Sequence, residues 1–180
     1  MYPKTATRSF ALKRLVAAAA LMVAGHAFAG DFLAEIGVGY GSGGNIDVND
    51  RGHRDSLLLN GAFGYRFDTN FGVRALLITD ADPVRGFDEY DRSFDDFLGV
   101  QATVYVPVAQ QLKMMGGLGL GQTRLDDGGF GDRGHQTVGD GVVSAGLQYQ
   151  FSRHYAMELH ADYLTHTHES SIGVTFQIPF

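Results

Sequence analysis

Apolar side chains recur at every second position along most of this chain. Residues 32–40 show the pattern, with Phe32, Ile36 and Tyr40 on one face and Glu35 on the other. A period of two is that of a β-strand, because successive side chains of a strand point to opposite faces of the sheet. The same alternation recurs in seven further segments, at residues 57–67, 71–77, 98–106, 112–120, 143–151, 155–163 and 172–180. The pattern therefore predicts eight strands.

The connections between these segments alternate between short and long. Short connections at 68–70, 107–111 and 152–154 take turns with longer polar ones, rich in Gly and Asp, at 41–54, 79–93, 125–139 and 165–170. An even number of antiparallel strands with short turns at one end and long loops at the other is typical of outer-membrane barrels. Strands of about ten residues also have the length that a tilted strand needs to cross a bilayer. We predict an all-β, eight-stranded, up-and-down antiparallel transmembrane β-barrel, with both chain ends on the periplasmic side.

The two faces of the predicted strands differ in polarity. The alternating apolar faces carry no charged residue, as a lipid-facing surface requires. The opposite faces mix glycines with polar residues, and the charges among them near membrane depth are Glu35, Arg66, Arg74, Lys113, Glu158 and Asp162. An eight-stranded barrel has room only for side chains in its interior. We therefore predict a packed, polar lumen and not an open pore.

The six inward charges, three acidic and three basic, predict an ion-pair network. A balance of this kind is expected because an unpaired buried charge costs several kcal/mol. Two similar hairpins, at 59–79 and 143–165, place Arg74 and Glu158 at equivalent heights on opposite walls of the barrel. We predict that these two residues meet across the lumen, with Glu35 and Lys113 as neighbours. Separate charges bridged by water are the alternative.

Aromatic residues flank the predicted short turns. The chain has no Trp, so Tyr and Phe must form the girdle that outer-membrane barrels place at the membrane interface. The six predicted girdle residues are Tyr65, Phe67, Phe71, Tyr149, Phe151 and Tyr155. The last strand closes the sheet against residues 32–40, and its alternation keeps Phe180 on the lipid-facing side.

Residues 1–29 are predicted to be a signal peptide. Arg8, Lys13 and Arg14 precede a short apolar run, and small residues at 27–29 suit a cleavage site before Gly30. Residues 30–180 would then form one outer-membrane barrel domain. We expect export to the cell outer membrane of a Gram-negative bacterium.

Charge and composition limit the partners. The 180-residue chain has a formal net charge of -6, from 14 basic and 20 acidic residues, and residues 1–29 hold four of the basic residues and none of the acidic ones. An acidic mature chain argues against a nucleic acid partner, because phosphate binding needs clustered Lys and Arg. The absence of cysteine excludes disulfides and thiolate metal sites.

The stretch "AGLQYQFSRHYAMELHADYLT" and the terminal "VTFQIPF" resemble the small outer-membrane β-barrels of the OmpA transmembrane-domain type. In that family the last strand ends in Phe, and this ending is similar to the signal that the barrel-assembly machinery recognises. The resemblance therefore implies that Phe176, Ile178 and Phe180 form the assembly signal. Some relatives block or gate the lumen with an interior salt-bridge network, a role that the resemblance implies for Arg74 and Glu158.

Histidines near the end of the chain raise the question of catalysis. Four residues lie close to carboxylates in the sequence: His160, His166, His168 and Ser170. Histidine, serine and carboxylate together can form the catalytic site of a hydrolase, and histidine with carboxylate can bind zinc. The alternation turns His160 into the lumen, where membrane lipid does not reach. We expect no catalytic residues, no metal site and no cofactor.

The long loops are acidic, with seven acidic and two basic residues between Thr79 and Asp96. This charge predicts an extracellular protein partner or a divalent cation that bridges the loops to lipopolysaccharide; a merely solvated loop is the alternative. The predicted function is a structural or surface-interaction role, in adhesion or envelope integrity, for a barrel embedded in outer-membrane lipid. The alternatives are a narrow gated ion pore and, less favoured, an enzyme that modifies lipid A.

Overall fold

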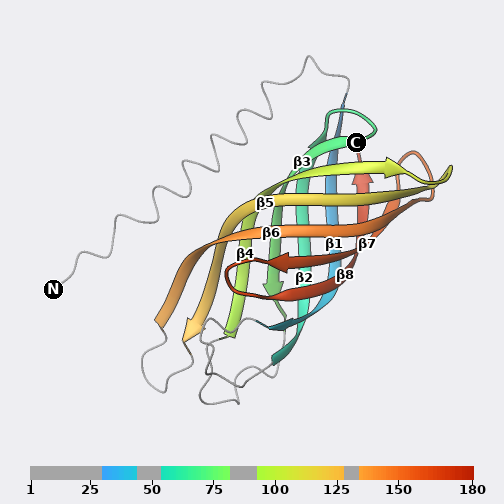
Figure 1. The fold of residues 1–180 in the computed structure, drawn as a ribbon. Helices are drawn as coiled ribbons and strands as arrows, with labels where there is room; N and C mark the ends of the chain where they lie inside the picture. The colour runs from blue at the N-terminus through green and yellow to red at the C-terminus, as the bar shows by residue number, and fades with distance from the viewer. Residues whose placement is uncertain (1–29, 44–53, 82–92, 128–133) are drawn as a thin grey trace. The chain divides into compact units, whose positions relative to one another are not determined.

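The computed structural model describes residues 30–43, 54–81, 93–127 and 134–180 (Figure 1). The predicted signal peptide, residues 1–29, lies outside the described residues and stays a prediction. Residues Asp31–Phe180 form one compact unit. Its eight strands are β1 (Asp31–Gly43), β2 (Arg54–Arg66), β3 (Phe71–Asp80), β4 (Ser93–Pro107), β5 (Leu112–Asp127), β6 (Gly134–Gln150), β7 (Ala156–Leu164) and β8 (Ser170–Pro179).

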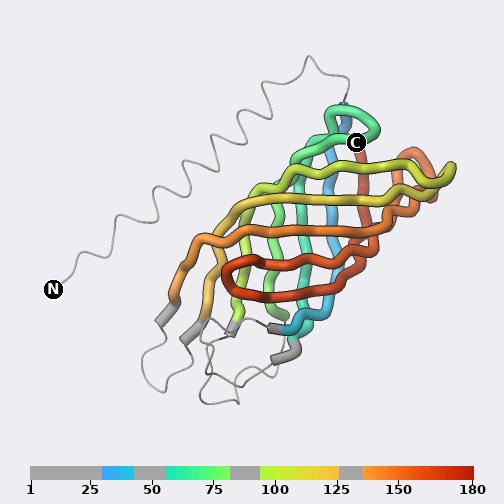
Figure 2. Tube along the Cα trace, viewed as in Figure 1, coloured from blue at the N-terminus to red at the C-terminus, as the bar shows by residue number. Residues whose placement is uncertain are grey.

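The strands form a closed antiparallel barrel in which each strand pairs with its neighbours in chain order. Strand β8 closes the barrel against β1, with a register that runs from Leu33 opposite Pro179 to Ser42 opposite Ser170. The backbone amides and carbonyls of Phe32 and Phe180 also exchange two hydrogen bonds, of 3.2 and 3.0 Å. The trace in Figure 2 follows this meander around the wall. The predicted eight-stranded fold is confirmed.

The outward face of the barrel is apolar and exposed. Leu120 of β5 has 78% of its surface exposed, and Ile36 of β1 has 69%. On a transmembrane barrel, lipid chains cover apolar side chains that are exposed to this extent. No helix among the described residues is both long and apolar enough to cross a membrane.

Strands β5 and β6 run beyond the apolar outward band. The sequence predicts a loop at 125–139, but β5 continues to Asp127 and pairs there with Gly134 of β6. Strand β7 begins to pair with β6 only at Val142, so among the described residues 134–140 pair with β5 alone. The predicted loop boundary is wrong because Gln136 and Thr137, which are neighbours on opposite faces of β6, are both exposed, and no alternation of apolar residues is required there.

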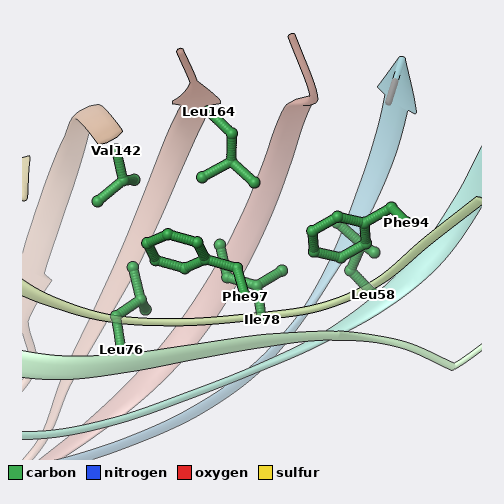
Figure 3. Packing of buried hydrophobic residues seen from close by; sticks show 7 residues of the cluster. All are labelled: Leu58, Leu76, Ile78, Phe94, Phe97, Val142 and Leu164. Atoms are coloured by element: carbon green, nitrogen blue, oxygen red, sulfur yellow. The ribbon is translucent and has the colours of Figure 1, made fainter. Parts of the chain in front are cut away.

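A layer of apolar side chains fills the lumen at the long-loop end (Figure 3). Its members are Leu58, Leu76, Ile78, Phe94, Phe97, Val142 and Leu164, each at most 5% exposed. A β-bulge between Phe94 and Asp96 shifts the register of β4 against β5. The bulge turns both Phe94 and Phe97 inward although they are three residues apart. The predicted packed, polar lumen is therefore corrected in one respect: it is polar in the middle and apolar toward the long loops.

Candidate functional site: a polar network across the lumen

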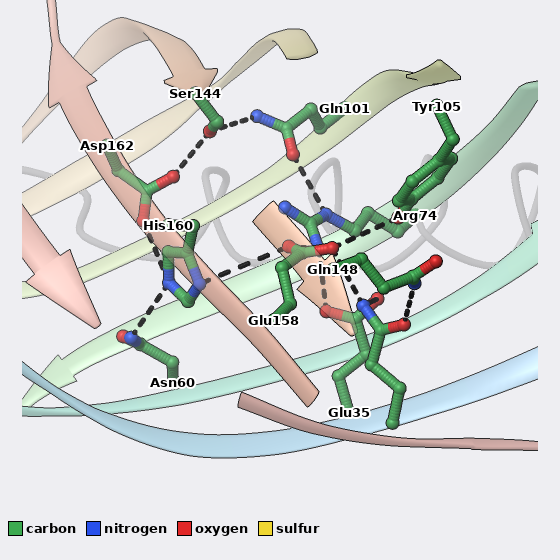
Figure 4. Close-up of polar contacts among 11 residues, drawn as sticks. Glu35, Asn60, Arg74, Gln101, Tyr105, Ser144, Gln148, Glu158, His160 and Asp162 are labelled. Atoms are coloured by element: carbon green, nitrogen blue, oxygen red, sulfur yellow. Dashed lines mark hydrogen bonds and ion pairs between the residues drawn. The ribbon is translucent and has the colours of Figure 1, made fainter. Parts of the chain in front are cut away.

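Arg74 is the centre of a buried network below the apolar layer (Figure 4). Its Nη1 donates to Glu35 Oε2 of β1 at 2.6 Å and to Glu158 Oε1 of β7 at 3.1 Å. Its Nε donates to Gln101 Oε1 of β4 at 2.8 Å. The guanidinium of one strand thus links three other strands, and the predicted contact between Arg74 and Glu158 is present in the structure.

Neutral side chains complete the coordination of the two glutamates. Gln177 Nε2 donates to Glu158 Oε2 at 2.9 Å and to Glu35 Oε1 at 3.3 Å. The Gln177 Oε1 accepts a hydrogen bond from Gln148 Nε2. Tyr105 donates its hydroxyl to Glu158 Oε2 at 3.4 Å. These donors matter because a single guanidinium faces two carboxylates, and each remaining buried oxygen needs a partner.

A second branch of the network runs from Gln101 toward the long-loop end. Gln101 Nε2 donates to Ser144 Oγ at 2.6 Å, and Ser144 Oγ donates to Asp162 Oδ1. The other oxygen of Asp162 lies 3.3 Å from His160 Nε2, and the same ring nitrogen lies 3.3 Å from Asn60 Nδ2. All five side chains are buried. The serine contacts the aspartate and not the histidine, so the group lacks the serine-to-histidine contact of a hydrolytic triad.

Two glycines leave room for this network. A Cβ at Gly117 of β5 would lie 2.7 Å from the amide group of Gln101, and a Cβ at Gly173 of β8 would lie 2.7 Å from Asn60 Nδ2. Any larger residue would push into the hydrogen-bonded amides. The glycines of the inward faces thus make space for the long polar residues opposite them.

Two of the predicted network residues lie apart from it. Lys113 was expected beside Arg74 and Glu158, but its Nζ donates to the Thr69 carbonyl at 3.2 Å, in the turn between β2 and β3. It is the second residue of β5, so its flexible chain reaches the edge of the barrel and water. The Arg66 guanidinium lies over the Tyr105 ring, 4.7 Å from its centroid. Asp162 joins Arg74 only indirectly, through Ser144 and Gln101.

The remaining histidine and serine candidates lie at the long-loop end. His166 and His168 are exposed in the turn between β7 and β8, and Ser170 begins β8. His168 Nδ1 lies 2.7 Å from the Tyr163 hydroxyl. Within the described ranges, no group of three or more His, Asp or Glu side chains is arranged to hold a metal ion. The structure therefore separates these residues from the buried His160 and Asp162.

Asp140 of β6 anchors this turn, beyond the apolar outward band that ends at Val143. Its carboxylate accepts hydrogen bonds from the His166 amide at 2.7 Å, from the Thr167 amide and hydroxyl at 3.2 and 2.7 Å, and from the Thr123 hydroxyl at 3.0 Å. Burial alone would raise the pKa of Asp140, but these hydrogen bonds outweigh it and hold the pKa below its usual value.

Glu169 precedes β8 at the same end and is only 3% exposed. Burial, with the nearby carboxylate of Asp80 as a second cause, raises its pKa to about 7. Its Oε1 has no hydrogen-bond partner in the described protein. A Cβ at Gly41 of β1 would lie 2.6 Å from that oxygen, so glycine is required where the carboxyl is inserted.

The predicted girdle residues lie at the short-turn end. Phe67, Phe71, Tyr149, Phe151 and Tyr155 are exposed on the outward face, whereas Tyr65 is buried. Phe180 packs on Phe32 and Phe63, with ring centroids 6.2 and 6.1 Å apart. Tyr65 joins this group through Phe32, at 5.1 Å, and thereby loses its exposure. An aromatic cluster therefore covers the closing seam between β8, β1 and β2; the assembly role of Phe176, Ile178 and Phe180 stays a prediction.

Several network residues were missed by the reasoning from sequence. Tyr105, Ser144 and Gln177 were not singled out, although each lies on the inward phase of its strand. The signal that would have found them is the alternation itself, applied to uncharged polar residues as well as to charged ones.

The geometry defines the class of protein. A closed barrel with an apolar outward face and hydrogen-bonded polar groups inside is an integral β-barrel of the outer membrane. The model of the family described as outer membrane protein beta-barrel domain matches residues 15–177, and the chain belongs to this family. A comparison with curated proteins finds no match.

Solved structures share the fold at low identity. The N-terminal β-barrel domain of Pseudomonas aeruginosa OprF matches with a TM-score of 0.61 at 14% identity, over 83% of this chain and 97% of that one. Neisserial surface protein A gives 0.64 at 12%, over 83% and 97%. Ail, the attachment invasion locus protein of Yersinia pestis, gives 0.58 at 18%, over 84% and 99%. At these identities the matches establish the barrel fold.

Proposed function

We propose that this barrel is a non-enzymatic protein of the outer-membrane surface, which acts in adhesion or envelope integrity through its long-loop end. The observation that carries the proposal is the filling of the lumen by two successive layers. The Arg74 network occupies the middle of the barrel, and the apolar layer around Phe97 occupies the long-loop end. A barrel filled in this way offers no channel. Its contact surface is the rim at the long-loop end, which includes the β5–β6 hairpin and the β7–β8 turn.

The rim carries a projecting hairpin. The β5–β6 hairpin extends beyond the apolar band, where Arg124 of β5 and Gln136 and Thr137 of β6 are exposed to a partner. Surface connections on a rigid scaffold are the usual place for binding residues. The names of two similar structures, a surface protein and an attachment invasion locus protein, support the same kind of role for this chain.

The charge of the rim indicates the partner chemistry. Its described acidic residues include the partly exposed Asp80 and Asp96 and the buried Asp140 and Glu169, and one exposed arginine, Arg124, pairs with Asp96 at 3.3 Å. One Ail structure contains the heparin analogue sucrose octasulfate, and an acidic rim would repel such a polyanion. We expect a neutral or basic protein surface, or a divalent cation that links the rim to lipopolysaccharide.

Shortening the β5–β6 hairpin tests this proposal. Deletion of residues 125–136 leaves the pair Arg124 and Thr137 at the tip and keeps the register below it. We expect cells with the shortened barrel to lose adhesion to matrix-coated surfaces, or resistance to detergent, to the extent that cells without the protein do. Heat-dependent gel mobility checks that the shortened barrel folds. Equal adhesion and equal detergent resistance in cells with and without the intact protein would refute the proposal.

A narrow gated pore is the second candidate, and one observation favours it. Arg74 is held by two carboxylates, an arrangement that can switch partners when one of them is protonated or displaced. The apolar layer above would still have to open, because Phe97 and Leu58 are fully buried there. We therefore favour the surface role over the gated pore.

A further inference from the structure

A small cavity lies at the short-turn end of the lumen, on the side of Arg74 opposite the apolar layer. It offers about 10 Å³ of space to the centre of a water-sized group, and its lining includes Leu33, Tyr65, Arg66, Gly72, Thr103 and Tyr105. A Cβ at Gly72 would lie 3.0 Å from Thr103 Oγ1 and 3.1 Å from the Tyr65 carbonyl. The absence of a side chain at position 72 thus keeps this part of the lumen open.

Arg66 presents unpaired donors at this cavity. The ring of Tyr105, 4.7 Å from the Arg66 guanidinium carbon, fixes the orientation of the guanidinium. The Nε and Nη2 atoms are buried and have no hydrogen-bond partner in the described protein. A guanidinium only donates hydrogen bonds and stays charged, so the group that satisfies these two atoms must be an acceptor.

The distribution of charge along the barrel favours an anionic acceptor. Arg74 faces Glu35 and Glu158, and Asp162 faces His160, so these acidic side chains have partners farther inside the barrel. Lys113 is the other cation at the short-turn end, and it repels Arg66. The sequence balances three acidic against three basic charges, but among the described residues no acid forms an ion pair with Arg66 or Lys113, and Glu35 attracts Arg66 only at longer range. Arg66 as a whole is only partly buried, but its buried Nε and Nη2 atoms are costly to leave without an acceptor.

We propose that Arg66, oriented by Tyr105, forms a binding site for a small anion at the short-turn mouth of the lumen. The cavity has room for about one water-sized group. The ligand is therefore a halide, or one oxygen of a carboxylate that enters from the periplasm. Nε and Nη2 donate to it, and its charge compensates Arg66 and Lys113.

Bromide replacement of chloride tests the site directly. Crystals of the refolded barrel grown in sodium bromide should give an anomalous peak within hydrogen-bond distance of Arg66 Nε and Nη2. The matched variant is Arg66→Gln, because the similar hairpin of β6 and β7 carries Gln150 at the equivalent position. This variant should fold, as judged by heat-dependent gel mobility, and should lose the peak.

A second measurement separates the two sources of anion and does not depend on crystals. Chloride should raise the unfolding midpoint of the wild-type barrel relative to isethionate, a bulky anion without a carboxylate, at equal ionic strength, and Arg66→Gln should abolish that shift. If added acetate removes the bromide peak, the site also accepts a carboxylate; if it does not, the site takes halides alone. The proposal is overturned if no bromide binds at Arg66, if the peak persists in Arg66→Gln, or if chloride and isethionate give the same midpoint.

Discussion

Arg74 and Glu158 meet inside the barrel although their strands, β3 and β7, stand on opposite walls. The Nη1 to Oε1 distance is 3.1 Å, and both side chains are almost completely buried. Glu35 shares the same Nη1 at 2.6 Å. The contact ties three strands together through one positive charge, so the stability of the barrel depends unequally on the three residues.

Replacing Arg74 should therefore lower the free energy of unfolding more than replacing one of its two glutamate partners. Arg74→Met leaves two buried carboxylates without a counter-charge and should lower the free energy of unfolding by about 3–5 kcal/mol. Glu158→Gln leaves Arg74 paired with Glu35 and should cost less. Urea unfolding in lipid vesicles measures both variants and the double variant. We expect a coupling energy of about 1 kcal/mol or more, and strictly additive effects would contradict the pairing.

Asp140 should control the order of the β7–β8 turn. Asp140→Asn removes the charge that accepts hydrogen bonds from the amides of His166 and Thr167, at a cost of about 1–3 kcal/mol. Amide hydrogen exchange at Thr167 should become faster. Asp96→Asn is the control, because its ion pair with Arg124 is partly exposed and contributes about 1 kcal/mol or less. Unchanged exchange at Thr167 in Asp140→Asn would refute the anchoring role.

Glu169 should make the barrel less stable as the pH rises toward neutrality. Its folded-state pKa of about 7 lies above the usual value of 4.5. Between these two values the folded state binds the proton and the unfolded state does not, so the free energy of unfolding falls as the pH increases. The loss is complete above about pH 7 and amounts to about 3 kcal/mol at most.

The variant Glu169→Gln isolates this effect, because an amide of the same size does not titrate. Unfolding midpoints measured between pH 4.5 and 8 should fall in the wild type and change less in Glu169→Gln. Asp140 acts in the opposite sense, because its lowered pKa removes stability only as the pH falls below its usual range. Parallel profiles for wild type and Glu169→Gln between pH 4.5 and 7 would contradict the assignment to Glu169.

Phe180 should stabilise the closing seam of the barrel. Phe180→Ala removes ring contacts with Phe32 and Phe63, which contribute about 0.5–1.5 kcal/mol each beyond the area that they bury. The folded, heat-modifiable fraction on gels should decrease. Phe71→Ala is the matched control, because Phe71 is an exposed aromatic residue at the same end and outside this cluster. Equal folded fractions for both variants would show that the cluster at the seam has no special role.

The barrel itself could be predicted from the sequence because lipid imposes a strict alternation on every spanning strand. The ends of β5 and β6 could not, since above the membrane water replaces lipid at the outward face and the outward residues need not be apolar. The contact of Arg74 with Glu158 was predictable from the similarity of two hairpins. The position of Lys113 was not, because the flexible side chain reaches the Thr69 carbonyl. Phe94 escaped notice because the β4 bulge changes the phase on which the prediction relied.

Planar-bilayer recording tests the central claim, that two layers close the lumen. The account predicts no conductance for the wild type and none for Arg74→Ala, because the apolar layer around Phe97 still closes the barrel. Phe97→Ala alone should also stay closed, by the polar network, whereas the double variant Arg74→Ala/Phe97→Ala should conduct. Stable channels in the wild type, or in Arg74→Ala alone, would contradict the account and favour a gated pore.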